Sequence, residues 1–397
     1  MATYVLSGVE ITKDDLLALI RSGVEEGQTI DFKRALNLSA DEAKRDLCID
    51  VIAFANASGG DIVFGMDQTK AAAAKELVPL PNFNGDTLEL QIRQICRSRI
   101  DPPVPGLRFH PIQIDPGKFV LVLRIPRSWN RPHSLASDPV TFHVRDGKGN
   151  RSMTIRDLRE AFDSATSTNE RMQRFRTQRI ANLLAGETPA PLVDTSLVVL
   201  HILPVSAFDR AIKIDIGRIM ENDYKPLLWP MNAPGFDQRI NFDGLLSYHP
   251  SLVKPVDSYL QVFNDGCIEA VCLTMLMGID GKTVIPWTYE HRIEKGLRNY
   301  LNLLQRQGLE PPFFVSVALV GAEGYRLFFT NPFGENVQSA PIDRAVLMAP
   351  EILIESYAAT YHDVLHEPFA RIWQAGGILD SPNYTDGHWS SKVQIPY

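Results

Sequence analysis

Cysteine is scarce in this sequence, and no two cysteines form a CxxC pair. The four residues are Cys48, Cys96, Cys267 and Cys272. A disulfide framework or a zinc site requires closely and regularly spaced ligands, so the spacing disfavours both. Buried thiols in a reducing cytoplasm are expected instead.

The sequence also lacks long apolar runs and a targeting signal. No stretch approaches the roughly 18 to 20 consecutive apolar residues that a membrane-spanning helix needs. The N-terminal segment has no basic region followed by an apolar core, which a secretory signal would require. We therefore expect a cytoplasmic protein without a membrane partner.

A strong net charge is missing as well, although the charges are unevenly distributed. The 397 residues include 40 Lys and Arg against 47 Asp and Glu, a net charge of −7. Residues 1–187 have 25 basic and 24 acidic side chains, residues 188–397 have 15 and 23, and residues 93–159 have 13 and 5. Such a basic stretch suits a polyanion, while the alternative is that the arginines are spread over a solvated surface.

The patterning predicts an α+β protein with two domains or more. Hydrophobic residues make up 45% of the chain, which is enough for more than one apolar core. Two antiparallel strands are predicted over residues 107–114 and 118–125, and a helix through residue 162 should close the first domain. An Arg-rich helix is expected over residues 168–185, either along nucleic acid or as a solvated connector, and the Pro-containing segment 186–191 is the clearest boundary. A second α+β domain begins with an apolar strand at residue 197 and continues with a hairpin over residues 259–277 and a long helix over residues 287–306. Its pair His362 and His366 lacks the Glu of an HExxH motif, so a structural role is favoured over metal binding.

The most informative stretch is residues 25–68, which reads as a strand, a helix and a second strand. In the first strand Ile30 and Phe32 share one face, and Asp31 and Lys33 share the other. Asp31 is therefore predicted to point away from the core.

The helix and the second strand of this stretch have clear boundary signals. Ser39 is predicted to cap the helix, which should end near residues 59–60. Residues 61–65 then form a buried strand that delivers Asp67 to its carboxyl end.

Three acids, Glu26, Asp31 and Asp67, are candidates to meet at one corner of this unit. Glu26 and Asp31 lie on opposite faces of an ideal strand, so they converge only if the chain bends, and Gly27 allows such a bend. Repulsion between carboxylates is relieved by a raised pKa or by a divalent cation such as Mg²⁺ or Mn²⁺. A bound cation would position water and the leaving oxygen of a phosphodiester. The alternative is that all three are solvated surface acids.

Several cationic and aromatic side chains are candidates for contacting nucleic acid. Lys33 would either pair with a phosphate or neutralise Asp31. The loop of residues 126–133 combines arginine with an indole and an imidazole, an arrangement common in phosphate clasping and base stacking. The alternative for this loop is that Trp129 fills the core edge and His133 caps a turn. The candidates are Lys33, Arg93, Arg97, Arg127, Trp129, Arg131, His133, Arg145, Lys148 and Arg151.

The pattern Glu26-x4-Asp31-Phe32-Lys33, followed by AFANASGGDIVFGMD at residues 53–67, resembles the Schlafen-type AlbA domain. Members of that family typically read Glu-x4-Glu-Phe-Lys and later Ala-Phe-Ala-Asn, Gly-Gly and Gly-Val-x-Asp. A weaker match continues through residues 125–134 and 142–153. The resemblance implies an AlbA-like mixed sheet with helices over residues 1–165, an Arg-rich helix and linker over residues 166–192, and a C-terminal α+β domain of unknown role over residues 193–397.

The resemblance also implies a function. Catalytic Schlafens look like metal-dependent endonucleases that cut tRNA or rRNA with three acids. The matched positions here are Glu26, Asp31 and the corner of Asp67 and Gln68, with Mg or Mn as the cofactor. Asp31 stands where the family usually has Glu, and Gln68 stands where it usually has Asp.

Two functional hypotheses compete, and a third is weaker. The first is a metal-dependent RNA endonuclease used in stress or phage defence. The second is a non-catalytic nucleic-acid-binding or regulatory protein, which Gln68 favours. In both cases RNA is the expected partner, single-stranded or structured DNA is the alternative, and a homodimer is a further option. ATP binding would rest on residues 58–60, but these glycines precede a strand and there is no GxxxxGK[ST] motif.

Overall fold

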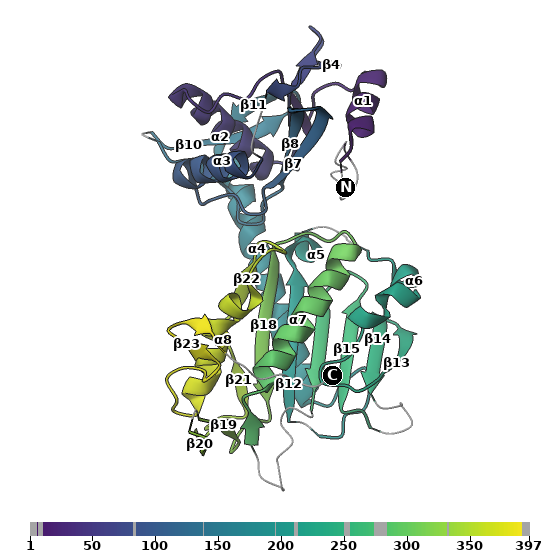
Figure 1. Cartoon of the computed structure of the whole chain (residues 1–397), viewed down its shortest axis with the longest axis vertical. Helices are drawn as coiled ribbons and strands as arrows, with labels where there is room; N and C mark the ends of the chain where they lie inside the picture. Colours follow the sequence, from purple (N-terminus) through teal and green to yellow (C-terminus); the bar gives the residue numbers. More distant parts are fainter. Residues whose placement is uncertain are drawn as a thin grey trace. The chain divides into compact units, whose positions relative to one another are not determined.

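The computed structural model describes residue 6 and residues 11–81, 85–137, 139–194, 196–209, 213–249, 255–273, 284–331 and 333–390. Helices and strands are mixed along the chain, which confirms the α+β fold class. The chain forms two compact units, Met1–Asn169 and Glu170–Tyr397, and each is described by itself (Figure 1).

The first unit combines a five-stranded sheet, a four-stranded sheet and the two-stranded pair β3–β4 with helices. The helices are α1 (Lys13–Arg21), α2 (Asp41–Asn56), α3 (Gly85–Arg99) and the first half of α4 (Ile155–Leu184). The strands are β1 (Ile30–Lys33), β2 (Gly59–Phe64), β3 (Met66–Gln68), β4 (Ala74–Leu77), β5 (Leu80–Pro81), β6 (Ile100–Asp101), β7 (Arg108–Asp115), β8 (Lys118–Pro126), β9 (Ser134–Leu135), β10 (Thr141–Asp146) and β11 (Gly149–Ser152).

A five-stranded sheet forms the centre of this unit. β1 pairs in parallel with β2, and β2 pairs antiparallel with β8, which also pairs with β5 and β7. Side chains alternate between two cores: Ile62 packs with the helices α2 and α3, and Val63 packs with α1 on the opposite face. β7 and β8 confirm the antiparallel strand pair predicted around residues 107–125.

The second sheet of the first unit contains the hairpin β10–β11 and lies against α2. Its order is β11-β10-β9-β6, and Arg145 stands opposite Asn150 in the hairpin. Asn56, the last residue of α2, donates from Nδ2 to the carbonyl oxygens of His133 at 2.9 Å and His143 at 2.8 Å. This side chain therefore fixes the small sheet to the helix that follows β1 in the chain.

The prediction that Ser39 caps α2 is wrong. The helix begins at Asp41 with Ala40 at the N-cap, and no side chain makes a capping bond. The hydroxyl of Ser39 donates instead to Oδ1 of Asn37 at 2.8 Å. Asn37 organises the preceding turn, a role that short polar side chains commonly take before helices.

The glycines on which the weaker ATP-binding hypothesis would rest are explained by packing. Gly59 and Gly60 open β2, and Gly59 has a φ of +72°. A Cβ at Gly59 would lie 2.5 Å from the backbone nitrogen of Arg127, and one at Gly60 would lie 2.5 Å from the ring of Phe54. Glycine is required here because two strands and a ring approach closely.

Helix α4 differs from the sequence prediction. One helix was expected to close the first domain near residue 162 and another to begin at residue 168, but a single helix runs through Ile155–Leu184. Residues 162–168 include six with small or polar side chains and no Gly or Pro, so nothing in this stretch interrupts the helix. The predicted domain boundaries at residues 165 and 192 stay a prediction. The boundary between the two compact units follows residue 169 in the chain.

The second unit is a large antiparallel sheet with helices. The helices, in addition to the second half of α4, are α5 (Val205–Asp209), α6 (Ile216–Ile219), the 3-10 helix η1 (Asn222–Leu227), α7 (Tyr289–Arg306) and α8 (Tyr361–Ala375). The strands are β12 (Leu197–Pro204), β13 (Asp237–Asn241), β14 (Gly244–His249), β15 (Ser258–Phe263), β16 (Ile268–Cys272), β17 (Val284–Pro286), β18 (Phe313–Val320), β19 (Arg326–Thr330), β20 (Asn336–Pro341), β21 (Val346–Met348), β22 (Ile352–Ile354), β23 (Tyr384–Thr385) and β24 (His388–Trp389).

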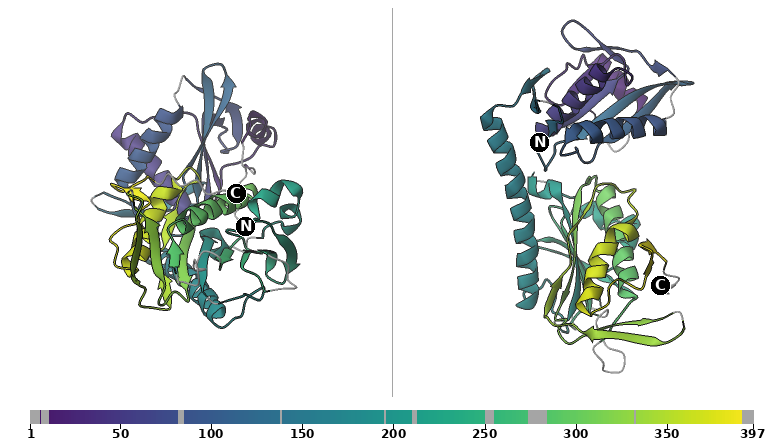
Figure 2. Two further views of the ribbon diagram at one scale, coloured as in Figure 1. Left: turned by 60° about the horizontal axis from the view of Figure 1, so that its bottom comes forward. Right: turned by 90° about the vertical axis from the view of Figure 1, so that its left-hand side faces the viewer.

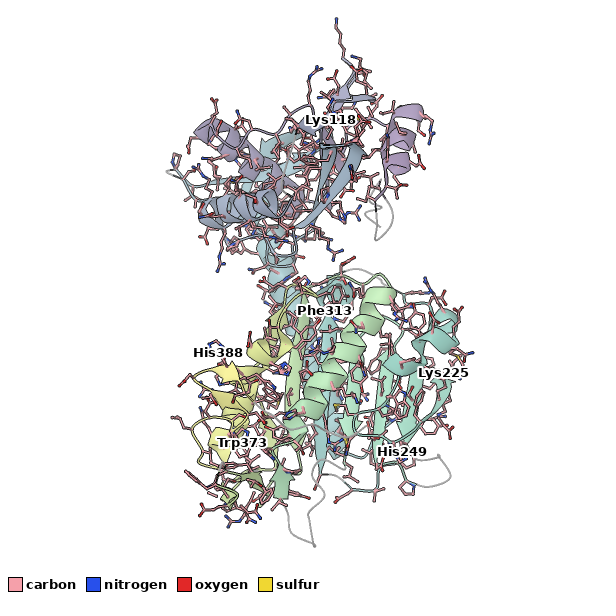
Figure 3. The ribbon with its side chains drawn as sticks, in the orientation of Figure 1. Lys118, Lys225, His249, Phe313, Trp373 and His388 are labelled. Atoms are coloured by element: carbon pink, nitrogen blue, oxygen red, sulfur yellow. The ribbon has the colours of Figure 1, made fainter. Side chains whose placement is uncertain are left out.

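The main sheet of the second unit has eight strands and a core on each face. Its order is β13-β14-β15-β16-β12-β18-β21, with β22 also paired to β18. Helices α7 and α8 cover one face, and the end of α4 covers the other (Figure 2). Phe313 and Trp373, both fully buried, belong to the larger core (Figure 3). The hairpin predicted near residues 259–277 is confirmed as β15 and β16, although residues 274–277 lie outside the described part.

No helix in the described residues is both long enough and apolar enough to cross a bilayer.

Candidate functional site

Asp31 is buried, in contrast to the predicted surface position. The residue is 2% exposed, and its Oδ1 accepts from Nη2 of Arg145 at 2.8 Å. Its Oδ2 lies 2.9 Å from Nζ of Lys33. The strand alternation was predicted correctly, but the face opposite the apolar core is covered by the hairpin β10–β11, which a local reading of the strand cannot reveal.

Arg145 closes this face of β1. Its side chain is 2% exposed and also donates from Nε to the carbonyl oxygen of Gly27 at 3.1 Å and from Nη1 to Oδ1 of Asn150 at 3.3 Å. The guanidinium lies over the ring of Phe54, 4.8 Å from its centroid. Arg145 was predicted to contact nucleic acid, but these partners make it an internal side chain that neutralises Asp31.

Asp50 is a member of this cluster that the sequence analysis missed. Its Oδ2 lies 3.2 Å from Nζ of Lys33, and its Oδ1 accepts from Nδ2 of Asn150 at 2.6 Å. Burial raises the pKa of Asp50, the charge of Lys33 opposes the rise, and Asp31 adds to it. An available signal was its spacing, because residue 50 lies three positions after Leu47 and one turn before Phe54 on the buried side of α2.

Lys33 links the two carboxylates. Burial lowers the pKa of Lys33, but the neighbouring charges of Asp50 and Asp31 outweigh it, and the net shift is upward. The ammonium therefore stays protonated between two acids, while 39% of its side chain remains exposed. Lys33 was expected either to pair with a phosphate or to neutralise Asp31. In the structure its ammonium group contacts Asp31 and Asp50.

Glu26 faces the same corner. The chain turns at Gly27, whose N–H donates to the carbonyl oxygen of Ile30 at 3.0 Å, and Oε1 of Glu26 accepts from the N–H of Phe32 at 2.9 Å. Burial raises the pKa of Glu26, the bond from Phe32 opposes the rise, and the nearby charge of Asp31 adds to it. With its nitrogen turned toward the acid, the amide of Gln68 donates to both carboxylate oxygens at 3.1 and 3.2 Å.

Asp67 takes a different direction from Gln68. Its Oδ2 accepts from Nη1 of Arg34 at 2.9 Å and from Nζ of Lys75 at 3.4 Å. Successive residues of a strand point to opposite sides, so in β3 the residue that faces Glu26 is the amide at position 68 and not the acid at position 67. The structure brings together Glu26 and Asp31 but not Asp67.

These residues do not fit a three-carboxylate metal site. Asp31 is held by Arg145 and Lys33, and a hard divalent cation requires several free oxygen ligands at about 2.0 to 2.6 Å. Within the described ranges, no group of three or more His, Cys, Asp or Glu side chains is placed to hold a metal ion. A bound Mg or Mn stays a prediction of the resemblance, without a set of ligands at this corner.

The predicted loop of residues 126–133 does not form an open nucleic-acid clasp. His133 is fully buried, its Nδ1 lies 2.6 Å from the carbonyl oxygen of Pro102, and burial lowers its pKa to about 4. Arg131 is 9% exposed and donates to Oγ of Ser164 at 2.8 Å. Trp129 and Arg127 are half-buried. A structural role, as in the alternative for this loop, therefore describes His133 better, and Arg131 is likewise an internal side chain.

The remaining candidates are exposed, and most have acidic partners. Arg93 pairs with Glu89 at 2.8 Å, and Arg151 pairs with Asp157 at 2.6 Å. Lys148 pairs with Glu25 at 2.5 Å and also donates to the carbonyl oxygen of Ala71 at 3.0 Å. Arg97 is exposed on α3.

Four exposed cations pair with acids in and beside this part of the first unit, and we call them the cation rim. They contact Asp31, Asp50, Asp67 or Glu25, and their side chains are between 39% and 64% exposed. They come from β1, from the residue after it, from β4 and from the turn between β10 and β11. The members are Lys33, Arg34, Lys75 and Lys148.

A protein-family model matches part of this chain. Residues 26–154 match the model described as Schlafen, AlbA_2, and this range contains β1, α2, β3 and the hairpin β10–β11. The match confirms the resemblance found in the sequence. Among curated proteins, no sequence matches this chain.

Two solved structures are similar to part of the chain. The DIP2311 protein from Corynebacterium diphtheriae is 22% identical over 36% of this chain and 27% of that chain, with a TM-score of 0.23. The N-terminal domain of a putative ATP-dependent DNA helicase RecG-related protein from Nitrosomonas europaea is 24% identical over 32% of this chain and 81% of that chain, with a TM-score of 0.25.

Proposed function

Residues 26–154 form a Schlafen AlbA_2 domain, and on this premise we propose that the protein binds RNA through the cation rim without metal-dependent cleavage. Membership of this domain family indicates a nucleic-acid-related function. The contacts of the corner favour binding over cleavage.

The observation that carries the proposal is the exposure of the rim. Lys33, Arg34, Lys75 and Lys148 keep between 39% and 64% of their side chains in contact with solvent. The ion pairs of Arg34, Lys75 and Lys148 are of the exposed kind, worth about 0 to 1 kcal/mol each, so an arriving phosphate can replace the carboxylate partner at little cost. Lys33 keeps its buried acids Asp31 and Asp50 and offers a phosphate only the exposed part of its side chain. Phosphate contacts from Lys and Arg supply most of the affinity of sequence-independent binding.

The argument against cleavage rests on Gln68 and Arg145. The amide of Gln68 occupies the position from which a third acid would face Glu26. Arg145 compensates the charge of Asp31 from inside the fold, where a cation ligand would need that oxygen free. The charge of Asp31 is therefore compensated by side chains of this chain, without a metal ion.

The binding test is fluorescence anisotropy of labelled tRNA with the full chain across a salt series. Arg34→Glu, Lys75→Glu and Lys148→Glu are each expected to weaken binding and to lower the slope of log Kd against log salt by about 1. Arg97→Glu is the matched control, because it changes the charge equally on α3, outside the rim. Equal weakening by the control would contradict the assignment of the rim as the binding surface.

The same samples test cleavage and the kind of nucleic acid. After addition of Mg or Mn, tRNA is expected to stay intact on a denaturing gel. Cation-dependent cleavage that disappears in Glu26→Ala and Asp31→Ala would replace the binding hypothesis by the endonuclease hypothesis. A single-stranded DNA of equal length, run in parallel, is expected to bind more weakly than tRNA.

A further inference from the structure

The strand β13 lies at the margin of the large sheet in the second unit (Figure 1). It pairs antiparallel with β14, with Ile240 opposite Leu245 and Arg239 opposite Leu246. In the described part of the chain, no backbone hydrogen bond joins Asp237–Asn241 to any strand other than β14. An edge of this kind presents unpaired N–H and C=O groups to solvent and can receive another strand.

One face of β13 is unusually apolar for a solvent-exposed edge. Ile240 is 59% exposed, and Phe242 in the following turn is 97% exposed. Phe236 precedes the strand, has the same parity as Ile240, and stacks edge-on with Trp229, itself 40% exposed. Apolar side chains at alternating positions therefore continue past both ends of the strand on one side.

The opposite face of β13 has two charges of opposite sign. Asp237 and Arg239 are both exposed, and they lie two positions apart in the strand, so they share a face. Arg239 uses one guanidinium nitrogen to donate to the carbonyl oxygen of Pro189 at 2.9 Å, which leaves further donors. Charges usually protect an edge from pairing, but a strand with one acid and one base can pair with a copy of itself.

We propose that β13 is a homodimer interface, in which it pairs antiparallel with β13 of a second copy around a two-fold axis. In such an isologous pair each contact occurs twice, and residues directly opposite each other share a face. The axis must then pass through a residue. Centring on Asn241 would set the strand against the turn of residues 242–243 and not against an extended edge, so four residues remain to be considered.

Charge selects among these registers. Centring on Asp237 opposes two acids, centring on Arg239 opposes two arginines, and centring on Ile240 sets Asp237 against Asp243. Centring on Gln238 instead sets Asp237 opposite Arg239 of the second copy, twice. This is the register in which unlike charges meet.

The same register suits the apolar face and the amide between the two charges. It sets Ile240 opposite Phe236 of the second copy, which would cover surface that is exposed in one copy. Gln238 meets Gln238 of the second copy. Two facing side-chain amides can each donate to and accept from the other.

Sedimentation velocity and light scattering of the full chain test the proposal. The wild type is expected to approach twice its mass of 44.4 kDa as concentration rises. Asp237→Arg and Arg239→Asp each place like charges opposite one another and are expected to raise the dimer Kd about tenfold or more. The double variant restores unlike pairs and is expected to return to near the wild-type Kd.

Phe333→Ser is the matched control, because Phe333 is 87% exposed elsewhere in the second unit and its loss should leave the dimer unchanged. Hydrogen exchange of the wild type gives a measurement that needs no variant: residues 237–241 should become protected as concentration rises. A wild type that stays at 44.4 kDa up to high concentration overturns the proposal. So does a dimer that both single variants leave intact, or a double variant that fails to recover.

Discussion

At the scale of single residues, Arg145 determines whether Asp31 can remain inside the fold. Both side chains are nearly inaccessible to solvent, and the ion pair between them measures 2.8 Å. A buried charge that loses its partner is strongly destabilising, whereas an exposed pair contributes little. The first unit contains both kinds of ion pair: the pair of Arg145 and Asp31 is buried, whereas in the pair of Lys148 and Glu25 each side chain is about half exposed.

We predict that Arg145→Met lowers the free energy of unfolding of the first unit by about 3 to 5 kcal/mol. Lys148→Met, the matched change in an exposed pair, should cost no more than about 1 kcal/mol. Hydrogen-exchange mass spectrometry of peptides from residues 26–154 would measure both. Adding Asp31→Asn to Arg145→Met should recover part of the loss, and equal effects of the two single variants would contradict the buried role of Arg145.

Glu290 provides a second test at the residue scale, through pH. Its carboxylate is fully buried and accepts from Trp373 at 2.6 Å, Ser381 at 2.7 Å and Asn383 at 2.8 Å. Burial outweighs these bonds and raises the pKa of Glu290 to about 7 from an ordinary value of 4.5. Because the folded pKa is the higher one, this group's stabilising contribution is present below pH 4.5 and is lost as the pH rises through about 7.

We therefore predict that the second unit loses roughly 2 to 3 kcal/mol of stability between pH 5 and pH 8 because of Glu290. Urea unfolding followed by tryptophan fluorescence is suitable, since four of the five tryptophans lie in this unit. Glu290→Gln should remove this part of the pH dependence, and Glu355→Gln, at an exposed position, should keep it. An unchanged pH profile in Glu290→Gln would assign the loss to other groups.

Sequence reasoning found some residues of the corner and could not find others. Glu26, Asp31 and Lys33 were identified because their spacing within one strand is local information. Asp50 and Asn150 were missed because their roles depend on β10–β11 returning to α2 from about one hundred positions away in the chain. The direction of Asp67 was mispredicted for a similar reason, since the short hairpin β3–β4 sets which side of β3 faces Glu26.

At the scale of elements, α4 illustrates how a polar helix acquires a fixed position. Its arginines were read as a solvated connector or a nucleic-acid surface, yet Arg179 donates twice to the buried carboxylate of Glu269, at 2.9 and 2.7 Å. His201 and Tyr259 contact the same carboxylate at 2.9 and 2.8 Å. Burial alone would raise the pKa of Glu269, but the bonds from Arg179 and His201 outweigh it and lower the pKa to about 2.

We predict that Arg179→Met destabilises the second unit by about 3 to 5 kcal/mol, because it leaves Glu269 without its main counter-charge. Arg174→Met, on the exposed side of the same helix, should change stability by no more than about 0.5 kcal/mol. The measurement is again urea unfolding by tryptophan fluorescence. Similar unfolding midpoints for the two variants would show that α4 is held by its apolar contacts alone.

Element boundaries were predictable where the sequence contains a strong local signal. The apolar runs of β8 and β12 and the helical spacing of α7 gave the correct element types. The continuity of α4 was not predicted, because a change from apolar to polar composition was taken as a boundary although it contains no helix-breaking residue. The missing cap at Ser39 has a comparable origin, since Asn37 competes for its hydroxyl within the same turn.

At the scale of the whole molecule, charge separates the two parts of the chain. Residues 1–187 are nearly neutral, with 25 basic and 24 acidic side chains, whereas residues 188–397 have 15 basic and 23 acidic ones. A net negative surface repels phosphate over a distance of about 10 Å at an ionic strength of 0.1 M. Binding of RNA is therefore expected to be restricted to the first part, where the cation rim lies.

We predict that photo-cross-links from RNA containing 4-thiouridine to the full chain fall within residues 26–154 and are absent from residues 188–397. Cross-linked peptides would be identified by mass spectrometry at two salt concentrations. Cross-links near the rim should decrease at the higher concentration, because each phosphate contact releases counterions whose return is favoured by salt. Lys148→Glu should reduce them, while Arg97→Glu should leave their positions unchanged. Prominent cross-links in the acidic part would mean that local base contacts outweigh its net charge, and the assignment of RNA binding to the rim would then have to be abandoned.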